Sequence, residues 1–259
     1  AQDVVMLSPL LLVITVILLL LGVAYLAVVV VVAHRFTMPR RVRPPALDES
    51  AAESFERVEF AARGDALPIA AWYGAAPGAS SAVIMVHGRD ACRADAVRGE
   101  TMAVASRLVA GGMSVLMIDL RGHGESGNSR LTFGHHERRD VLGAVDHLLA
   151  RGYLPQRIGV FGASLGGASS IAAAAEELAI GAIITDSSFA DLESLLRVQF
   201  QRLTRLPCWC LRGALVAASV LTRTRLTARP PHQLIRRLRG RPTLVIHAAG
   251  DSFVPVRHA

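Results

Sequence analysis

The chain has 259 residues, enough for one or two domains, and 52% of them are hydrophobic. All 28 basic residues are arginine, and with 21 acidic residues the net charge is +7. Without lysine these 259 residues can form neither the Schiff base of a pyridoxal enzyme nor the phosphate-binding site of a P-loop nucleotidase. No nucleic-acid-binding motif accompanies the charge, so we expect no nucleic-acid partner and instead a basic face towards anionic lipid. Three cysteines, Cys92, Cys208 and Cys210, have neither the spacing of a disulfide framework nor that of a zinc site.

Residues 9–33 are an almost unbroken run of Leu, Val, Ile and Ala. This run exceeds the roughly 20 residues that a helix needs to cross a bilayer. Four arginines lie between residues 35 and 43, whereas only Asp3 precedes the run, so the positive-inside bias favours a cytoplasmic body. A secretory signal peptide is the alternative, but the run is long and no Ala-x-Ala-like site follows it. We therefore expect a single-pass transmembrane anchor over residues 1–34.

After the anchor, three prolines within residues 35–54 predict a linker, and from residue 55 onward strands alternate with helices. This rhythm predicts an α/β fold with a mostly parallel sheet flanked by helices. The first two expected strands form a hairpin. The expected strands are 55–61, 67–73, 82–86, 114–118, 158–161, 182–185 and 243–247, and the expected helices are 95–110, 135–151 and 165–177.

Residues 191–239 interrupt the rhythm with helical material that contains no evident strand. Within it, residues 206–221 are strongly apolar and are flanked by arginines. We expect a lid-like insertion over the site or a helix that lies on the membrane surface, while a plain solvated basic face is equally consistent with the charges. A second membrane span is disfavoured, because the apolar stretch is short and contains Pro207, Arg212 and Gly213.

The residues that organise the chain are 162–166, which read Gly-Ala-Ser-Leu-Gly between an apolar strand and a helix of small residues. A serine on a sharp strand-to-helix turn presents its hydroxyl away from the backbone, and the turn requires small residues two positions to either side. Gly162 and Gly166 supply them. An ordinary glycine-rich turn is the alternative, but the setting favours Ser164 as a nucleophile.

Taken together, the motifs resemble those of the α/β-hydrolase superfamily over residues 83–258. The segments that carry the resemblance are 86–89 (Val-His-Gly-Arg), 119–127 (Asp-Leu-Arg-Gly-His-Gly-Glu-Ser-Gly), 162–166 and 247–255 (His-Ala-Ala-Gly-Asp-Ser-Phe-Val-Pro). An apolar anchor ahead of such a domain is similar to the membrane-anchored serine hydrolases, which include depalmitoylase-like and peptidase-like members. The resemblance implies an α/β-hydrolase domain over residues 55–259.

The resemblance also implies roles for individual residues. Ser164 would be the nucleophile and Asp251 the acid of a catalytic triad, with the backbone N–H groups of Arg89 and Leu165 as the oxyanion hole. Asp251 could instead be a turn aspartate. Asp186, which also follows a strand, is a fallback acid or a helix cap. No metal or organic cofactor is implied.

The histidine of the triad is the missing part. In this superfamily the base follows the acid after a further strand. His258 matches a residue near the start of the helix after the acid loop, and the other histidines fall in loops or at a helix start. We therefore expect the domain to be truncated at its C-terminus, with the base histidine beyond Ala259.

The sequence thus predicts a membrane-anchored serine hydrolase that cleaves an ester, thioester or amide bond through an acyl-enzyme on Ser164. The expected substrate is a small molecule or an acylated one, and a lipid-like substrate is one candidate. The sequence does not indicate an oligomeric state. One alternative is a non-catalytic, membrane-tethered scaffold with a hydrolase-like fold. Another is a dinucleotide site, because residues 122–127 match Gly-x-Gly-x-x-Gly, but no helix opens on the third glycine as such a site requires.

Overall fold

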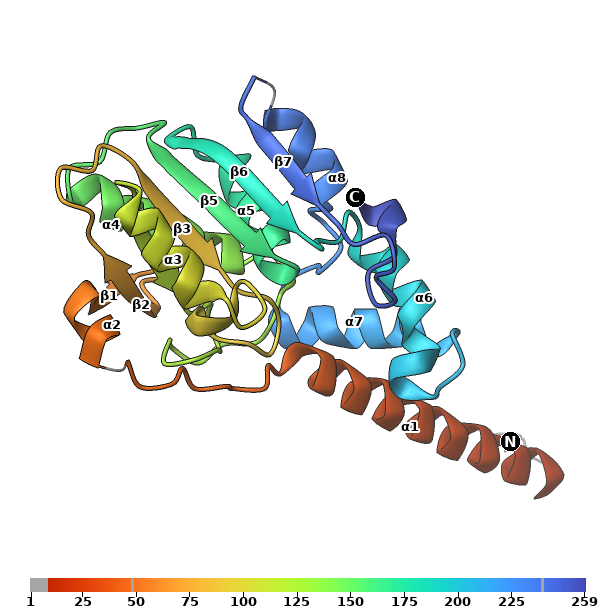
Figure 1. Ribbon diagram of the computed structural model, residues 1–259. Helices are drawn as coiled ribbons and strands as arrows, with labels where there is room; N and C mark the ends of the chain where they lie inside the picture. Colours follow the sequence, from red (N-terminus) through yellow and green to blue (C-terminus); the bar gives the residue numbers. More distant parts are fainter. Residues whose placement is uncertain (1–8, 48, 239) are drawn as a thin grey trace.

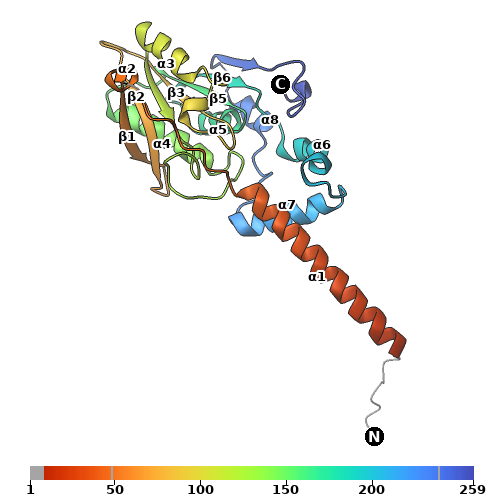
Figure 2. The same cartoon turned by 60° about the horizontal axis from the view of Figure 1, so that its bottom comes forward.

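The computed structural model describes residues 9–47, 49–238 and 240–259. Residues 1–8 of the expected anchor, Asp48 of the expected linker and Arg239 of the expected insertion lie outside the described residues. Helix α1 (Pro9–Thr37) extends away from a body in which strands and helices alternate (Figures 1 and 2). Among the described helices, α1 is the one long and apolar enough to cross a membrane, with a mean hydropathy of 3.1 over its most apolar window.

The described strands form one twisted sheet in the order β1-β2-β4-β3-β5-β6-β7. β1 and β2 form the expected antiparallel hairpin, β2 pairs antiparallel with β4, and the strands from β4 to β7 run parallel. The strands are β1 (Phe55–Ala61), β2 (Pro68–Gly74), β3 (Ala82–Val86), β4 (Ser114–Ile118), β5 (Ile158–Ala163), β6 (Ile180–Asp186) and β7 (Thr243–Ile246). The predicted α/β fold is confirmed.

Helices cover both faces of this sheet because side chains alternate along each strand. Ile84 and Val86 of β3 face α4 (Glu137–Ala150) and α5 (Leu165–Ala174) in the main core. Met85 between them faces the opposite side, where α3 (Thr101–Ala110) packs. Towards β7 that second face is uncovered in the described residues, and Ile184, Leu244 and Ile246 are exposed there.

Two helices differ from the sequence-based expectation at their ends. α3 begins at Thr101 rather than near Asp95, because a short 3-10 turn (Arg93–Asp95) is followed by Gly99 at a φ of 83°. That left-handed conformation breaks the helical path. α5 ends at Ala174, three residues before the predicted end, so the strand after it starts earlier.

The segment that follows the apolar run is in contact with the body. α1 continues three residues into the expected linker, and the carbonyl of Thr37, a fully buried residue, accepts a hydrogen bond from the Leu131 N–H at 2.7 Å. The Arg41 guanidinium donates to the carbonyls of His123, Gly124 and Ser126. A further helix, α2 (Glu49–Ser54), precedes β1.

Between β6 and β7 the chain forms the helices α6 (Leu192–Thr204), α7 (Cys210–Thr222) and α8 (Pro231–Leu234) and the 3-10 turn η2 (Ile235–Leu238). α7 lies along the C-terminal half of α1 (Figure 1). Tyr25 of α1 stacks on Trp209 at a ring distance of 5.4 Å, and Phe36 stacks on Phe200 of α6 at 6.3 Å. The end of α1 is therefore part of the second apolar core of the protein.

Candidate active site

Ser164 occupies the turn between β5 and α5, at the carboxyl edge of the parallel strands. Its backbone has φ 49° and ψ −112°, a strained conformation for a residue with a side chain. The Ser164 N–H donates to the carbonyl of Asp186 at the end of β6, at 2.8 Å, and Ser188 Oγ donates to the Ser164 carbonyl at 3.1 Å. The backbone of this turn is thus fixed by neighbouring strand ends, and the Ser164 hydroxyl remains outside these bonds.

The glycines on either side of Ser164 are required by close backbone approach. A Cβ on Gly162 would fall 2.5 Å from the Gly166 carbonyl carbon, and a Cβ on Gly166 would fall 2.4 Å from the Val86 carbonyl oxygen. Both contacts are far inside van der Waals distance and involve backbone, which cannot rotate away. The small residues that the sequence places around Ser164 therefore allow α5 to begin directly against β3 and β5.

Two backbone N–H groups beside Ser164 have no acceptor in the described part of the chain. They belong to Leu165, the first residue of α5, and to Arg89, in the loop after β3. The loop approaches the serine closely, since a Cβ on Gly88 would lie 3.4 Å from Ser164 Cβ. The first N–H groups of a helix are unpaired by geometry, so the unpaired Arg89 N–H is the more informative of the two.

Two buried histidines shape the loop that carries Arg89. The Leu120 N–H donates to His87 Nε2 at 3.0 Å and the Asp90 N–H donates to His123 Nε2 at 3.2 Å. Each ring therefore carries its proton on Nδ1, and these protons are donated to the carbonyls of Gly88 and Arg121. Burial lowers the pKa of His87 to about 3 and lowers that of His123 as well, so both rings are neutral.

The loop after β4 is filled by its own side chains. The fully buried Asp119 carboxylate accepts from the Arg93 guanidinium at 2.6 Å and from the backbone N–H groups of Arg93 and Glu125. A Cβ on Gly124 would lie 1.9 Å from Asp119 Oδ2. Gly124 is thus required by packing against a carboxylate, and the next helix, α4, begins only at Glu137.

Asp251 lies in the loop after β7, at the same edge of the sheet. Its Oδ1 accepts hydrogen bonds from the N–H groups of Phe253 and Val254 at 2.8 and 2.9 Å. Its Oδ2 is 3.9 Å from Nε2 of His247, a ring that donates to the Val254 carbonyl. One carboxylate oxygen therefore shapes the loop, and the other has no hydrogen bond within the described residues.

Asp186 does not cap the following helix. That role belongs to Asp191, whose side chain accepts from the Ser194 N–H at 2.6 Å. Asp186 instead accepts from the Ser187 hydroxyl at 2.9 Å and holds the Ser164 N–H through its carbonyl.

Across the described residues, none of the nine histidines of the sequence hydrogen-bonds to Ser164. His258 is buried against the loop before α6, where its Nδ1 accepts from the Ala190 N–H at 3.3 Å, and burial lowers its pKa. His87 and His123 have both ring nitrogens occupied. The structure thus brings Ser164, Arg89 and Leu165 together and leaves the proton acceptor of the serine unassigned.

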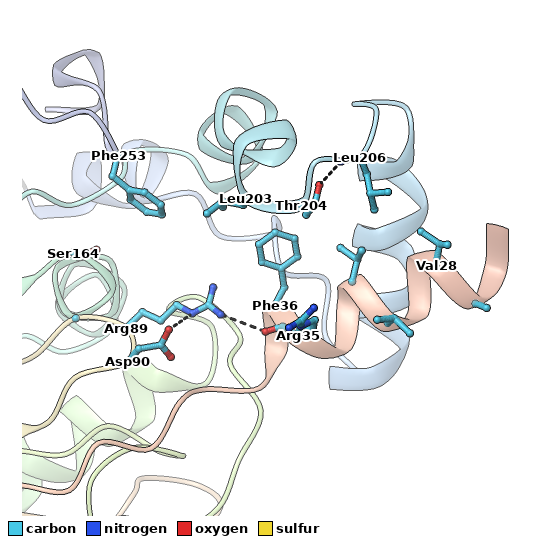
Figure 3. Close-up of a pocket in the computed structure, with 14 residues that line it drawn as sticks. Val28, Arg35, Phe36, Arg89, Asp90, Ser164, Leu203, Thr204, Leu206 and Phe253 are labelled. Carbon is cyan, nitrogen blue, oxygen red and sulfur yellow. Dashed lines mark hydrogen bonds and ion pairs between the residues drawn. The ribbon is translucent and has the colours of Figure 1, made fainter. Parts of the chain in front are cut away.

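A cavity of about 990 Å³ opens beside Ser164. Its polar end is formed by Ser164, Arg89 and Asp90, as Figure 3 shows, together with Gly88. The rest of its wall is mainly apolar and comes from α1, α6, the residues after α6 and the loop after β7. The residues of that wall are Ala27, Val28, Val31, Val32, Arg35, Phe36, Leu203, Thr204, Leu206 and Phe253.

The contribution of α1 to this cavity was not foreseen from the sequence. A uniformly apolar segment satisfies the criterion for a membrane span and gives no face that would point towards the body. The available signals were indirect: the aromatic residues Tyr25 and Phe36 and the small residue Gly213, which pack where α1 meets the rest of the chain.

Comparison with known proteins places this arrangement in a family. The curated Bacillus subtilis (strain 168) protein YqkD, described as uncharacterized, is 30% identical over 151 residues, which is 56% of this chain. The chain spans about half the length of that relative, 48%.

Solved structures share the fold at lower identity. The Pyrococcus furiosus esterase Pf2001 is 23% identical with a TM-score of 0.66, over 85% of this chain and 80% of the esterase chain. A Mycobacterium tuberculosis puromycin-hydrolyzing peptidase is 20% identical with a TM-score of 0.61, over 83% of this chain and 34% of the peptidase. The Pyrococcus horikoshii acylaminoacyl peptidase is 17% identical with a TM-score of 0.56, over 79% and 34% of the two chains.

These likenesses show the fold alone, and the family comes from the sequence itself. Residues 78–236 match the family described as serine aminopeptidase, S33. The match runs from just before β3 to the last helical turn before β7, so it includes the Ser164 turn and the loops on either side. Because it covers more than half of the sequence, the chain belongs to the serine aminopeptidase S33 family of α/β-hydrolases.

Proposed function

We propose that this chain is the catalytic part of a membrane-anchored serine hydrolase, with Ser164 as the nucleophile that cleaves an ester, thioester or amide bond. The observation that carries the proposal is the strained Ser164 turn beside a large cavity, with the unpaired N–H groups of Arg89 and Leu165 next to it. A strained residue is maintained only where the surrounding structure fixes it, and such residues concentrate at active sites.

In the proposed reaction, Ser164 Oγ attacks the substrate carbonyl carbon while its proton passes to a histidine base. The carbonyl oxygen becomes an oxyanion, which the N–H groups of Arg89 and Leu165 stabilise. The intermediate then collapses, the leaving group takes the proton from the base, and an acyl-Ser164 ester remains. Water then attacks the carbonyl carbon of that ester by the same steps, which releases the carboxylic acid and restores the Ser164 hydroxyl.

The proposal assigns Asp251 as the residue that orients the base, because its Oδ2 is free for a further hydrogen bond. The histidine that takes the serine proton is left unassigned, because none of the described histidines hydrogen-bonds to Ser164. The carboxylate would hold the imidazole in the tautomer that accepts the serine proton and would stabilise the resulting cation.

Membrane attachment through α1 is part of the proposal. The N-terminal two thirds of the described helix expose apolar side chains on all sides, as a bilayer span requires, whereas Val29, Val32, Ala33 and Thr37 are buried against the body. A cleaved signal peptide would take this packing with it, so the contacts support a permanent anchor. The arginines that follow the helix favour a cytoplasmic body.

The test is covalent labelling of the full-length protein by a fluorophosphonate probe, which reacts with activated serines. Ser164→Ala is expected to abolish labelling. Ser170→Ala is the control, because Ser170 lies on α5 and its hydroxyl only donates back to the Gly166 carbonyl at 2.7 Å. Labelling that survives in Ser164→Ala would refute the nucleophile, and a wild type that takes no label would favour the non-catalytic scaffold.

A further inference from the structure

The cavity beside Ser164 has two chemically different ends. At one end are the candidate nucleophile and the Arg89–Asp90 ion pair, whose side chains are 3.3 Å apart. The other end is formed by Val28, Val31 and Val32 of α1, together with Leu206. Figure 3 shows Phe36, Leu203 and Phe253 around the space between the two ends. A ligand that fills this space needs a polar, reactive head and a long apolar tail.

The apolar end is built from the helix that is proposed to enter the membrane. The lining residues of α1 run from Ala27 to Phe36, which is about 14 Å along the helix axis. Residues 9–26 ahead of them span about 27 Å, close to the thickness of a bilayer core. The cavity therefore lies at the level where α1 leaves the bilayer, and Val28 and Val31 belong both to its wall and to the exposed surface of the helix.

The side chain of Arg35 lies at the level where α1 is proposed to leave the bilayer. Arg35 lines the cavity, its side chain is exposed, and in the described residues no carboxylate pairs with its guanidinium. Its carbonyl accepts from Arg89 at 3.3 Å, which ties the loop beside Ser164 to the end of α1. An unpaired guanidinium at a bilayer surface suits the phosphate of a lipid headgroup.

We propose that α1 is one wall of the substrate site and that the site takes the long acyl chain of a bilayer lipid ester, with the chain along Val28 and Val31 and the ester carbonyl at Ser164. This inference rests on the proposed function and adds its substrate class. The anchor then selects the substrate as well as holding the protein at the membrane. Apolar contact along the wall stabilises the bound chain, and each methylene that loses its contact reduces kcat/KM by about three- to four-fold.

The experiment compares two valines on α1 with nearly equal exposure. Val28, 37% exposed, lines the cavity, whereas Val30, 40% exposed, does not. In the full-length protein, Val28→Trp fills the apolar end and is expected to lower the ratio of kcat/KM for a palmitoyl ester to that for a butyryl ester at least tenfold. Val30→Trp places the same side chain on another face of the helix and is expected to keep the wild-type ratio.

A second pair tests the opposite wall and guards against misfolding of an anchor variant. Leu203, 46% exposed, lines the cavity from α6, and Val198, 47% exposed, lies on the same helix outside it. Leu203→Trp is expected to lower the ratio as Val28→Trp does, and Val198→Trp is expected to leave it unchanged. Equal losses on palmitoyl and butyryl esters, or equal effects of the lining and non-lining variants, would overturn the acyl site.

The same proteins separate this inference from the function on which it rests. Fluorophosphonate labelling of Ser164 reports the nucleophile without a long chain, so normal labelling with an unchanged palmitoyl-to-butyryl ratio contradicts the acyl site alone. The source of the chain is tested with a phospholipid ester in phosphatidylcholine vesicles against a water-soluble acyl thioester carrier. Turnover of the vesicle ester is expected, and turnover of the soluble carrier alone would overturn the bilayer source.

Discussion

At the scale of single residues, the site depends on a costly conformation that neighbouring backbone maintains. A residue such as Ser164, at φ 49° and ψ −112°, is strained by about 1–3 kcal/mol. The contacts of Gly162 and Gly166 with backbone, and the hydrogen bond from the Ser164 N–H to Asp186, hold it there. The sequence predicted this turn well, because Gly-x-Ser-x-Gly between a strand and a helix has few structural solutions.

The role of Asp251 is tested by an isosteric change. Asp251→Asn keeps an oxygen that can accept from the Phe253 and Val254 N–H groups, so the loop after β7 is expected to stay folded. Loss of the charge that orients the base is expected to lower kcat roughly 10⁴-fold, as in other serine triads. Asp186→Asn is the matched control, and the measurement is steady-state ester hydrolysis by the full-length protein.

The two variants have opposite predicted outcomes. A large loss in Asp186→Asn with little change in Asp251→Asn would make Asp186 the acid. The sequence left both carboxylates open because each follows a strand. The hydrogen bonds in which the two carboxylates differ depend on the folded geometry, so they could not be read from the sequence. The cap of α6 also depends on the folded geometry. Asp191 caps this helix, five residues beyond Asp186, the candidate named from the sequence.

At the scale of elements, the contact between α1 and α7 holds the N-terminal helix at the cavity. α7 approaches α1 at Gly213, where an added Cβ would lie 2.2 Å from Tyr25 Oη and 2.9 Å from a methyl group of Val29. Tyr25 is itself held by stacking on Trp209. A small residue at this point lets the two helices pack closely, as is common for helices in membranes.

Gly213→Leu is expected to separate these helices. Overpacking of a fitted contact typically costs about 1–3 kcal/mol, so the melting temperature of the detergent-solubilised protein should fall, and the palmitoyl-to-butyryl ratio should fall with it as α1 moves off the cavity. The control is Val216→Leu on the same helix, at a side chain that is 65% exposed. A Gly213→Leu protein with unchanged stability and ratio would show that the contact is not needed.

The sequence predicted some elements closely and others only in outline. β1, β3 and β4 match their expected ranges, because short apolar runs between turn residues have clear limits. The N-terminus of α3 was expected six residues too early, since the turn at Gly99 has no strong signal in an alanine-rich stretch. The burial of the last third of α1 could not be predicted, because a helix that is apolar on every side does not reveal which side meets protein.

At the scale of the whole molecule, buried charged pairs and neutral histidines make stability depend on pH. The buried Arg121 forms an ion pair with the buried Asp140 and another with the more exposed Asp65. The pKa of Asp65 is about 2 despite the desolvation that opposes this shift, because Arg121 and Arg139 pair with its carboxylate. His87 is the clearest neutral group, since it is fully buried and accepts a backbone N–H. Its protonation would remove that acceptor and place a charge in the core.

The His87 ring is therefore expected to make the folded state less stable as the pH falls below 6.5. The pKa of His87 is about 3 in the folded state and 6.5 when exposed, so between these values the unfolded chain binds a proton that the folded chain does not. Stability consequently rises with pH in this window, by about 1.4 kcal/mol per pH unit for this one group. Above pH 6.5 the group contributes no further slope.

The measurement is the free energy of urea unfolding between pH 5 and pH 7, where carboxylates of ordinary pKa remain charged. His87→Gln retains an acceptor and cannot titrate, so its pH slope below 6.5 is expected to be shallower than that of the wild type by the amount of one proton. Parallel slopes for the two proteins would show that His87 is already charged in the folded state.

The central claim, that Ser164 carries the acyl group beside a cavity walled by the anchor, is tested most directly by trapping the intermediate. Full-length protein is quenched in acid shortly after mixing with a palmitoyl ester and digested with trypsin, which releases the peptide 158–197. The account predicts a palmitoyl group on this peptide, assigned to Ser164 by fragmentation and absent from Ser164→Ala. A palmitoyl group on another residue, or full turnover by Ser164→Ala, would contradict it.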